Sequence, residues 1–370
     1  MADPSKAVSG RPGEAAGTAD PFAGVIGHAA VLAMLRRETE RPAQAYLMVG
    51  PSSTGKATVA RRFAAALLCA GDAGCVRRAL AGNHPDLVAV EPEGRAAITV
   101  DQARHTVSLA SLAPLVGERK IFLFEDGGTM NDEAANALLK TIEEPTASTV
   151  FVIVADSEDD LPTTVASRCR TVVFGRVDDA EMVAGLVARG IDRDQAQRAA
   201  LISGGRPGLA LSLATRPEVA EFRHAWLSVP LRLSERPGDA YVLADAVALA
   251  AEPLLIALRD DQARRSAAAE SAGGAKALKE RHERELRRAT AALYVAGLEI
   301  LAGFYRDAAA AQYGAPVRNP DIPATALTGV LPAVAVANAQ RVLETIEALE
   351  ANQRPTLAFA GLFADLGAAG

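Results

Sequence analysis

The chain has 370 residues, of which 49% are hydrophobic and only 4% aromatic, and its formal net charge is −6. This length exceeds one typical core and predicts two or three domains, and the abundance of alanine favours helix over sheet. This negative net charge argues against a protein that binds nucleic acid through its own surface alone. A subunit of a DNA-binding assembly is compatible with such a charge.

The ends and the cysteines of the chain point to a cytoplasmic protein. Residues 1–20 are rich in Ala, Gly, Pro and Ser without an apolar period, which predicts a disordered tail. We find no signal-peptide pattern and expect no apolar run of membrane-spanning length. Three cysteines, an odd number without the spacing of a disulfide framework, fit a reducing compartment.

Five short apolar runs predict the strands of a parallel sheet. They are residues 45–49, 87–91, 121–124, 150–155 and 171–174. Helical patterns lie before and between them, among them residues 28–39 and a helix to about Leu112 that Asp101 is expected to cap, and this alternation is typical of a parallel α/β domain.

The first strand runs into a glycine loop, Gly50-Pro51-Ser52-Ser53-Thr54-Gly55-Lys56, followed by a helix to about Cys69. Strand, glycine loop, lysine and helix are what a phosphate-binding P-loop requires, with Gly50, Gly55 and Lys56 as its key positions. The hydroxyl residue that should follow the lysine is replaced by Ala57, and Thr58 comes one residue late, about 100° round a helix. We therefore expect possible phosphate binding with impaired Mg²⁺ placement; the alternative is a loop that folds but binds nothing.

Residues 121–170 hold the other distinctive features. Two acids, Glu125 and Asp126, follow the third strand, and a helix with cap-type residues then begins near Asn131 and ends before Pro145. The fourth strand follows, and then the run Ser167-Arg168-Cys169.

The run from Met130 to Pro145, which contains Asn136-Ala137-Leu138-Leu139-Lys140-Thr141-Ile142-Glu143-Glu144, together with Ser167-Arg168-Cys169, resembles the clamp-loader branch of the AAA+ ATPases. The resemblance covers roughly residues 22–215 well and the C-terminal part more thinly. It implies three domains after the tail: an AAA+ nucleotide-binding-like domain at 21–176, a helical lid at 177–215 and an all-α collar domain for oligomerisation at 216–370.

The C-terminal part has a helical pattern. Residues 259–274 are charged and rich in Ala and Gly, which predicts a flexible connection between helices, and the periodic segment at about 276–311 predicts a long helix.

The resemblance also assigns roles to individual residues. Arg168 would enter the ATP site of a neighbouring subunit as an arginine finger, the alternative being a surface arginine in a salt bridge. Glu125 and Asp126 would be the acids that hold Mg²⁺ and orient water, but their order is reversed from the family's Asp-Glu. The segment 25–27 would lie against the nucleotide base, or would simply be a core contact. The polar group that senses the γ-phosphate would lie within 156–160.

Two further sites of the family are incomplete here. The family has a four-cysteine zinc module between Cys69 and His84, and only Cys69 and Cys75 remain, so zinc is not expected. Among Gly204-Gly205-Arg206-Pro207-Gly208, Pro207 takes the place of the arginine that ATP-hydrolysing relatives carry.

These residues are compatible with three functions. The first is a largely non-hydrolysing clamp-loader stator, with the gamma/tau and delta subunits as partners and with the sliding clamp and primer-template DNA reached through the complex. The second is an ATP-hydrolysing motor subunit of the gamma/tau kind. The third is a self-assembling AAA+ remodeller, which would need its own working ATP site. Position 57, the acid order at 125–126 and position 207 favour the stator.

Overall fold

The computed structural model describes residues 19–92, 97–268, 275–351 and 353–368. It divides into two compact units, one of Met1–Gly185 with Arg206–Gly208 and one of Leu186–Gly205 with Leu209–Gly370. Most of the predicted tail, residues 1–18, lies outside the described residues. Asp20 is described and pairs with Arg36 at 2.8 Å. The separation of a lid at 177–215 from a collar stays a prediction.

A five-stranded parallel sheet forms the centre of the first unit, as predicted. Its strands are β1 Ala45–Val49, β2 Leu87–Ala89, β3 Lys120–Phe124, β4 Thr149–Val154 and β5 Arg170–Val173. Their order is β2-β3-β4-β1-β5, and the neighbouring strands all pair in parallel. All residues of β1, β3 and β4 are buried, because helices cover both faces of the sheet.

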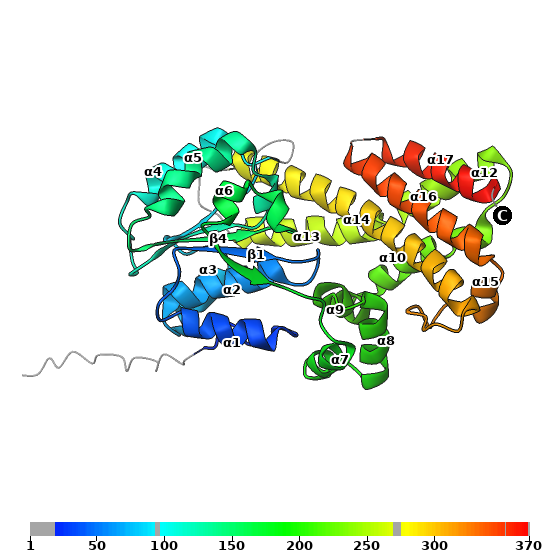
Figure 1. Ribbon diagram of the computed structural model, residues 1–370, viewed down its shortest axis with the longest axis horizontal. Coiled ribbons are helices and arrows are strands. Elements are labelled where there is room, and N and C mark those ends of the chain that lie inside the picture. Colours follow the sequence, from blue (N-terminus) through cyan, green and yellow to red (C-terminus); the bar gives the residue numbers. More distant parts are fainter. Residues whose placement is uncertain (1–18, 93–96, 269–274, 352, 369–370) are drawn as a thin grey trace, which may run out of the picture. The chain divides into compact units, whose positions relative to one another are not determined.

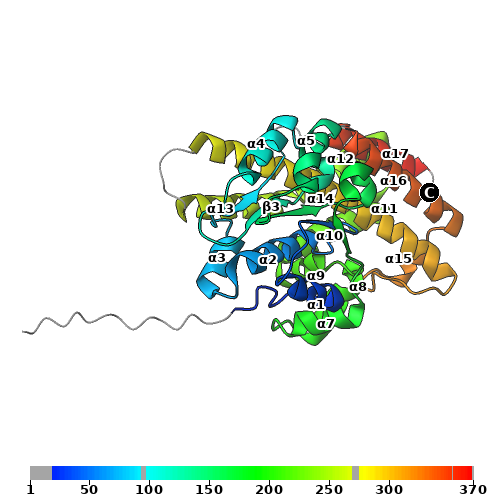
Figure 2. The same ribbon diagram turned by 60° about the vertical axis from the view of Figure 1, so that its left-hand side comes forward.

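Figures 1 and 2 show the helices of this unit in two layers. On one face lie α1 Ala29–Glu38, α2 Lys56–Cys69 and α3 Ala73–Leu80; on the other lie α4 Val100–Ala110, α5 Asp132–Glu143 and α6 Thr163–Ala166. Two separate cores fill the spaces between. Leu35 and Phe63 pack against one face of the sheet, whereas Leu138 and Val165 pack against the other.

The helix ends follow ordinary capping chemistry, with one difference from the prediction. Asn131 caps α5 by accepting a hydrogen bond from the Ala134 N–H at 2.8 Å. At α4 the cap is Thr99, not the expected Asp101, because Thr99 and Gln102 form a reciprocal capping box. Asp101 instead lies within the first turn, with its side chain 88% exposed.

Gly50 marks a close approach between two strands. Its φ is 144°, and a Cβ at this position would lie 2.0 Å from the Phe174 carbonyl oxygen. The Phe174 N–H also donates to the Val49 carbonyl at 2.7 Å. The start of the glycine loop is therefore pressed against the chain that leaves β5, and only glycine fits there.

The second unit is helical in its described residues. The remaining helices of the chain are α7 Asp179–Val187, α8 Arg193–Ser203, α9 Pro207–Thr215, α10 Pro217–Leu227, α11 Val229–Arg232, α12 Pro237–Leu249, α13 Glu252–Ala268, α14 Ala275–Gln312, α15 Ala324–Thr328, α16 Pro332–Glu350 and α17 Pro355–Ala368; two 3₁₀ turns are η1 Gly127–Thr129 and η2 Glu158–Asp160. Helix α14 matches the long periodic segment predicted at 276–311. The connection predicted at 259–274 is wrong for residues 259–268, which belong to α13; residues 269–274 lie outside the described residues.

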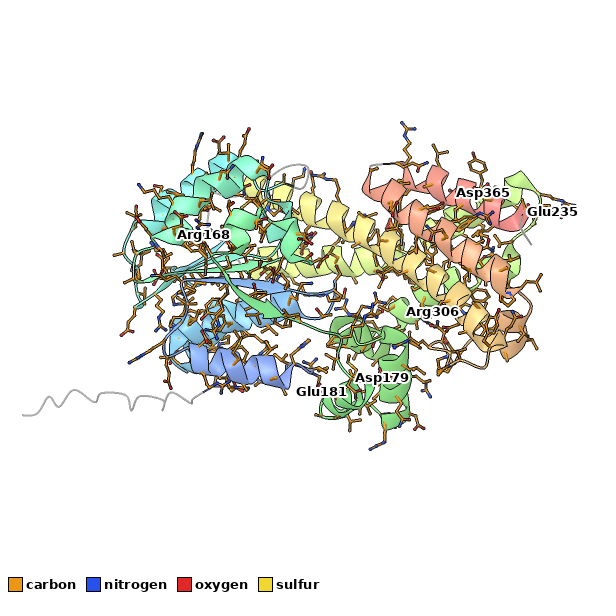
Figure 3. All side chains as sticks on the ribbon, viewed as in Figure 1. Arg168, Asp179, Glu181, Glu235, Arg306 and Asp365 are labelled. Carbon is orange, nitrogen blue, oxygen red and sulfur yellow. A yellow bond between two sulfur atoms is a disulfide. The ribbon has the colours of Figure 1, made fainter. Side chains whose placement is uncertain are left out.

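The core of the second unit is built around Trp226. The indole lies edge-on to Phe359 at 5.2 Å and packs against the backbone of α14 at Gly297, where a Cβ would clash with it at 2.0 Å. A buried polar network lies in the same unit: Asp307 accepts hydrogen bonds from the backbone and side chain of Asn319, and Arg223 binds Asn319 from α10. Figure 3 labels Arg306 on α14, next to Asp307.

One apolar stretch corrects the expectation that none reaches membrane-spanning length. Residues Gly238–Arg264 are long and apolar enough to cross a membrane, by length and composition only. Their secondary structure is not continuous, because α12 ends at Leu249 and α13 begins at Glu252. Leu243, Val247 and Leu255 belong to the core of the second unit. A core helix of a soluble protein passes the same test, so this one stretch is weak support for a membrane span.

Candidate nucleotide-type site and the Arg168 corner

The glycine loop follows β1 and leads directly into α2. Backbone φ is positive at Gly50, Ser53 and Gly55, and α2 begins at Lys56. This places a helix N-terminus behind a loop of exposed backbone, which is the general arrangement for an anion. The loop predicted from the sequence is therefore formed in shape.

The Lys56 side chain is turned into the loop. Its Nζ donates to the Gly50 carbonyl, to the Pro51 carbonyl at 2.9 Å and to Asp156 Oδ1 at 2.8 Å. Only 6% of the side chain is exposed. The loop's own carbonyls and one carboxylate therefore bind the lysine that would reach a phosphate.

Asp156 was not singled out from the sequence, which named only the range 156–160 for a sensor group. It follows β4, and β4 is the neighbour of β1, so the two strand ends lie at the same edge of the sheet. Its carboxylate accepts hydrogen bonds from Lys56 and from the Ser52 hydroxyl at 2.7 Å. Burial favours the neutral acid, but these two donors outweigh it and hold the pKa of Asp156 below its ordinary value.

Glu125 lies at the end of β3 and forms a bidentate ion pair with Arg61 of α2. Both carboxylate oxygens accept from the guanidinium, and this pairing raises the pKa of Arg61 despite its partial burial. Asp126 is exposed and begins the η1 turn. The two acids predicted to hold Mg²⁺ are thus in place along the chain, but an arginine already binds the first.

The residues at this site do not fit a magnesium nucleotide in the usual way. Ala57 carries no hydroxyl, and Thr58 is exposed on α2. Pro207 is buried and begins α9, and Arg206 is partly buried beside it. Gly50, Gly55 and Lys56 are therefore brought together, whereas the groups for the metal are absent or engaged elsewhere.

The segment at residues 25–28, just before α1, packs against the rest of the first unit. Ile26 is buried and leaves no room for a Cβ at Gly185, which would come within 2.7 Å. His28, which the sequence did not single out, binds the Thr54 carbonyl through Nε2 at 2.8 Å and contacts Phe174 edge-on. The segment thus closes one side of the glycine loop with a side chain.

Arg168 lies on the surface of the same unit, at the end of α6 (Figure 3). Its Nη1 donates to the Thr164 carbonyl at 2.7 Å, and its Nη2 forms an ion pair with Glu143 at the end of α5. The side chains of Arg168 and Glu143 are 38% and 41% exposed. Burial raises the pKa of the neighbouring Cys169 thiol to about 12, so that cysteine packs as a neutral side chain.

The cysteine region differs from the expectation of free thiols. Cys69 and Cys75 form a disulfide between the end of α2 and α3, with Cα atoms 5.4 Å apart. A ring nitrogen of His84 lies close to the two sulfur atoms, and the three atoms are within 4.8 Å of one another. Two bonded sulfurs and one imidazole do not fit a structural zinc ion, which takes four ligands. Asp72 caps α3 through the Cys75 N–H, and this tight turn brings the two cysteines together.

The sheet order, the glycine loop after β1, the acids after β3 and the arginine before β5 define an AAA+-type domain. A family model described as "DNA polymerase III, delta subunit" matches residues 27–178. Within the first unit, these residues are therefore similar to a DNA polymerase III clamp-loader domain, and delta-prime subunits are among the proteins that they resemble.

Those relatives match part of the chain. The delta-prime subunit of Pseudomonas aeruginosa is 39% identical over 136 residues, which is 34% of this chain and 42% of that protein. The delta-prime subunit of Bacillus subtilis is 29% identical, over 55% of this chain and 64% of that protein. The chain thus matches less than two thirds of the length of these relatives.

A solved structure, a DNA polymerase III gamma subunit-related protein from Thermotoga maritima, covers 91% of this chain and 98% of its own, with 17% identity and a TM-score of 0.43.

Proposed function

We propose that this chain is a clamp-loader subunit of a DNA polymerase III holoenzyme and acts as a largely non-hydrolysing stator. It supplies Arg168 to the ATP site of a neighbouring subunit while the assembly places a sliding clamp on primed DNA. Its partners are the gamma/tau and delta subunits, and it meets the clamp and the primer-template DNA through the complex. Its place is the cytoplasm, at the replisome on the nucleoid.

One observation carries the proposal: Arg168 is exposed and its present partner is exchangeable, on a domain whose own metal site is incomplete. An arginine provided in trans can raise phosphoryl transfer about 10³–10⁵-fold. The half-exposed pair with Glu143 contributes at most about 1 kcal/mol. Exchange of that carboxylate for the γ-phosphate of a neighbour therefore costs little. The alternative motor function would require a hydroxyl at position 57 and a free Glu125.

The test is ATP turnover by the reconstituted complex, stimulated by DNA and clamp, with wild-type chain or Arg168→Ala. We expect a loss of at least about a hundredfold at one partner site, since a finger supplies that much or more. Size-exclusion chromatography must show that the complex stays intact. The matched control is Arg170→Ala, which removes an exposed arginine two residues away that pairs with Glu38 and leaves turnover within about twofold. Equal turnover for wild type and Arg168→Ala contradicts the finger.

A further inference from the structure

The contacts of Lys56 use the whole hydrogen-bonding capacity of its side chain. An ammonium group has three N–H donors and no acceptor. The Gly50 carbonyl, the Pro51 carbonyl and Asp156 Oδ1 provide three acceptors, one for each donor. A phosphate oxygen could bind Nζ only by displacing one of these acceptors. The lysine is buried, so the displaced bond could not be replaced readily by water.

Of the three acceptors that bind Lys56, only the Asp156 carboxylate carries a negative charge. Asp156 also binds the Ser52 hydroxyl at 2.7 Å, and its backbone carbonyl accepts from the Gly50 N–H at 3.1 Å. The residue is therefore joined to the glycine loop at three points, and it brings a negative charge to the lysine that would receive phosphate. The Asp160 carboxylate accepts from the Asp156 N–H at 2.9 Å and fixes its backbone. A nucleotide phosphate would meet like-charge repulsion here.

A second pair occupies the metal side of the site. The Arg61 guanidinium holds both oxygens of Glu125 in a bidentate pair, which is stronger than a single charge-assisted contact; 53% of the Arg61 side chain is exposed, whereas the Glu125 side chain is 23% exposed. Glu91 and Asp126 lie near enough to add attraction for Arg61. A divalent cation would have to displace this arginine, and Ala57 offers no hydroxyl to replace what would be lost.

We propose that the site is closed by internal counter-ions: Asp156 supplies the negative charge that a nucleotide phosphate would bring to Lys56, and Arg61 supplies the positive charge that Mg²⁺ would bring to Glu125. The ligand class excluded in this way is the magnesium nucleoside triphosphate. The closure is a property of this chain alone and holds whichever subunit receives Arg168. Removal of the Asp156 charge opens the phosphate half, and removal of Arg61 opens the metal half.

The first experiment titrates the full-length chain with ATP in EDTA, by calorimetry, for wild type and Asp156→Asn. Asparagine keeps the size of the side chain but removes its charge. We expect wild type to bind ATP with a Kd above about 1 mM, and Asp156→Asn to bind at least about tenfold more tightly, with a Kd of about 0.1 mM or below. The double variant Asp156→Asn with Lys56→Ala loses that gain.

The matched control is Asp159→Asn, which removes the same charge from an exposed residue of the η2 turn. If this control gains as much affinity as Asp156→Asn, the effect is one of net charge and the internal counter-ion is wrong. Tight binding of ATP by wild type also overturns the closure and needs no variant. Thermal unfolding and circular dichroism establish that each variant is folded.

The second experiment adds Mg²⁺ to the Asp156→Asn chain, with and without Arg61→Met. With Arg61 present, we expect Mg²⁺ to change ATP affinity by less than about twofold; with Arg61→Met, affinity rises with Mg²⁺ by about fivefold or more, because Glu125 becomes available to the metal. A strong effect of Mg²⁺ while Arg61 is still in place overturns the cation half of the proposal.

Discussion

Lys56 and Arg168 are two cations of the same unit that hold their partners differently. Lys56 is 6% exposed and binds two backbone carbonyls and a carboxylate, whereas Arg168 is 38% exposed and pairs with a carboxylate that is itself 41% exposed. A cation whose donors are satisfied in a buried site is costly to redirect, and a surface pair exchanges easily. The chain thus fixes the charge that would serve its own nucleotide and leaves available the one that could serve a neighbour.

The largest expected effect separates the two cations by function. In the reconstituted complex, Lys56→Ala changes DNA- and clamp-stimulated ATP turnover by less than about twofold, against a hundredfold or greater loss for Arg168→Ala. The physical reason is that Lys56 binds only its own chain. Steady-state phosphate release measures both. An effect of Lys56→Ala as large as that of Arg168→Ala reverses the comparison, because it means that the glycine loop is in use.

The next effect separates them by stability. Lys56→Met removes three partly buried hydrogen bonds and leaves two loop carbonyls without their donor, so we expect a loss of about 1–3 kcal/mol in the free energy of unfolding. Arg168→Met breaks a half-exposed pair and lowers it by no more than about 1 kcal/mol. Urea unfolding followed by circular dichroism compares the two; a larger loss for Arg168→Met would mean that its pair is the structural one.

A smaller effect tests the hold of Glu143 on Arg168. Glu143→Gln keeps the shape of the side chain but weakens the ion pair, and the free energy of unfolding changes by less than about 0.5 kcal/mol. ATP turnover of the complex stays equal or rises up to about threefold, because Arg168 has one competitor fewer. The control Glu144→Gln changes the adjacent acid. A tenfold loss with Glu143→Gln alone would instead make Glu143 a residue that positions the finger.

The smallest effect is a pH dependence of the loop. The pKa of Asp156 is lowered in the folded chain, so its contribution to stability is fully present above its unfolded pKa of about 3.9 and is lost as pH falls through the lower folded pKa. The difference in unfolding free energy between wild type and Asp156→Asn should therefore be constant from pH 7 to about 5 and decline below about 4. Urea titrations at several pH values measure it, and a difference that grows on acidification contradicts the Lys56–Asp156 pair.

The sequence predicted the sheet well because its strands are continuous apolar runs, and it placed the glycine loop because that spacing is local. It did not identify Asp156 or Arg61, whose roles depend on which strands are neighbours. The position of Asp156 directly after the strand that pairs with β1 was the available signal. Likewise, Arg61 lies on α2, five residues after Lys56, and its pairing with Glu125 becomes visible only when α2 is packed beside the end of β3.

Other differences have local causes. The connection predicted over 259–274 failed because alanine and arginine, which made it appear open and charged, are strong helix formers, and residues 259–268 are helical. The sequence did not predict the disulfide, because the six-residue spacing of Cys69 and Cys75 does not indicate that they are close. The turn capped by Asp72 brings them together.

Gly50 affects what can be concluded from a G-x4-G-K pattern about the use of ATP. Any larger residue there would strike the Phe174 carbonyl, so the glycine serves the joint between β1 and the chain after β5 whether or not a nucleotide ever enters. A lineage that gave up ATP would have to keep this glycine to keep its sheet. The first glycine of a G-x4-G-K pattern is therefore not, by itself, evidence that a chain uses ATP.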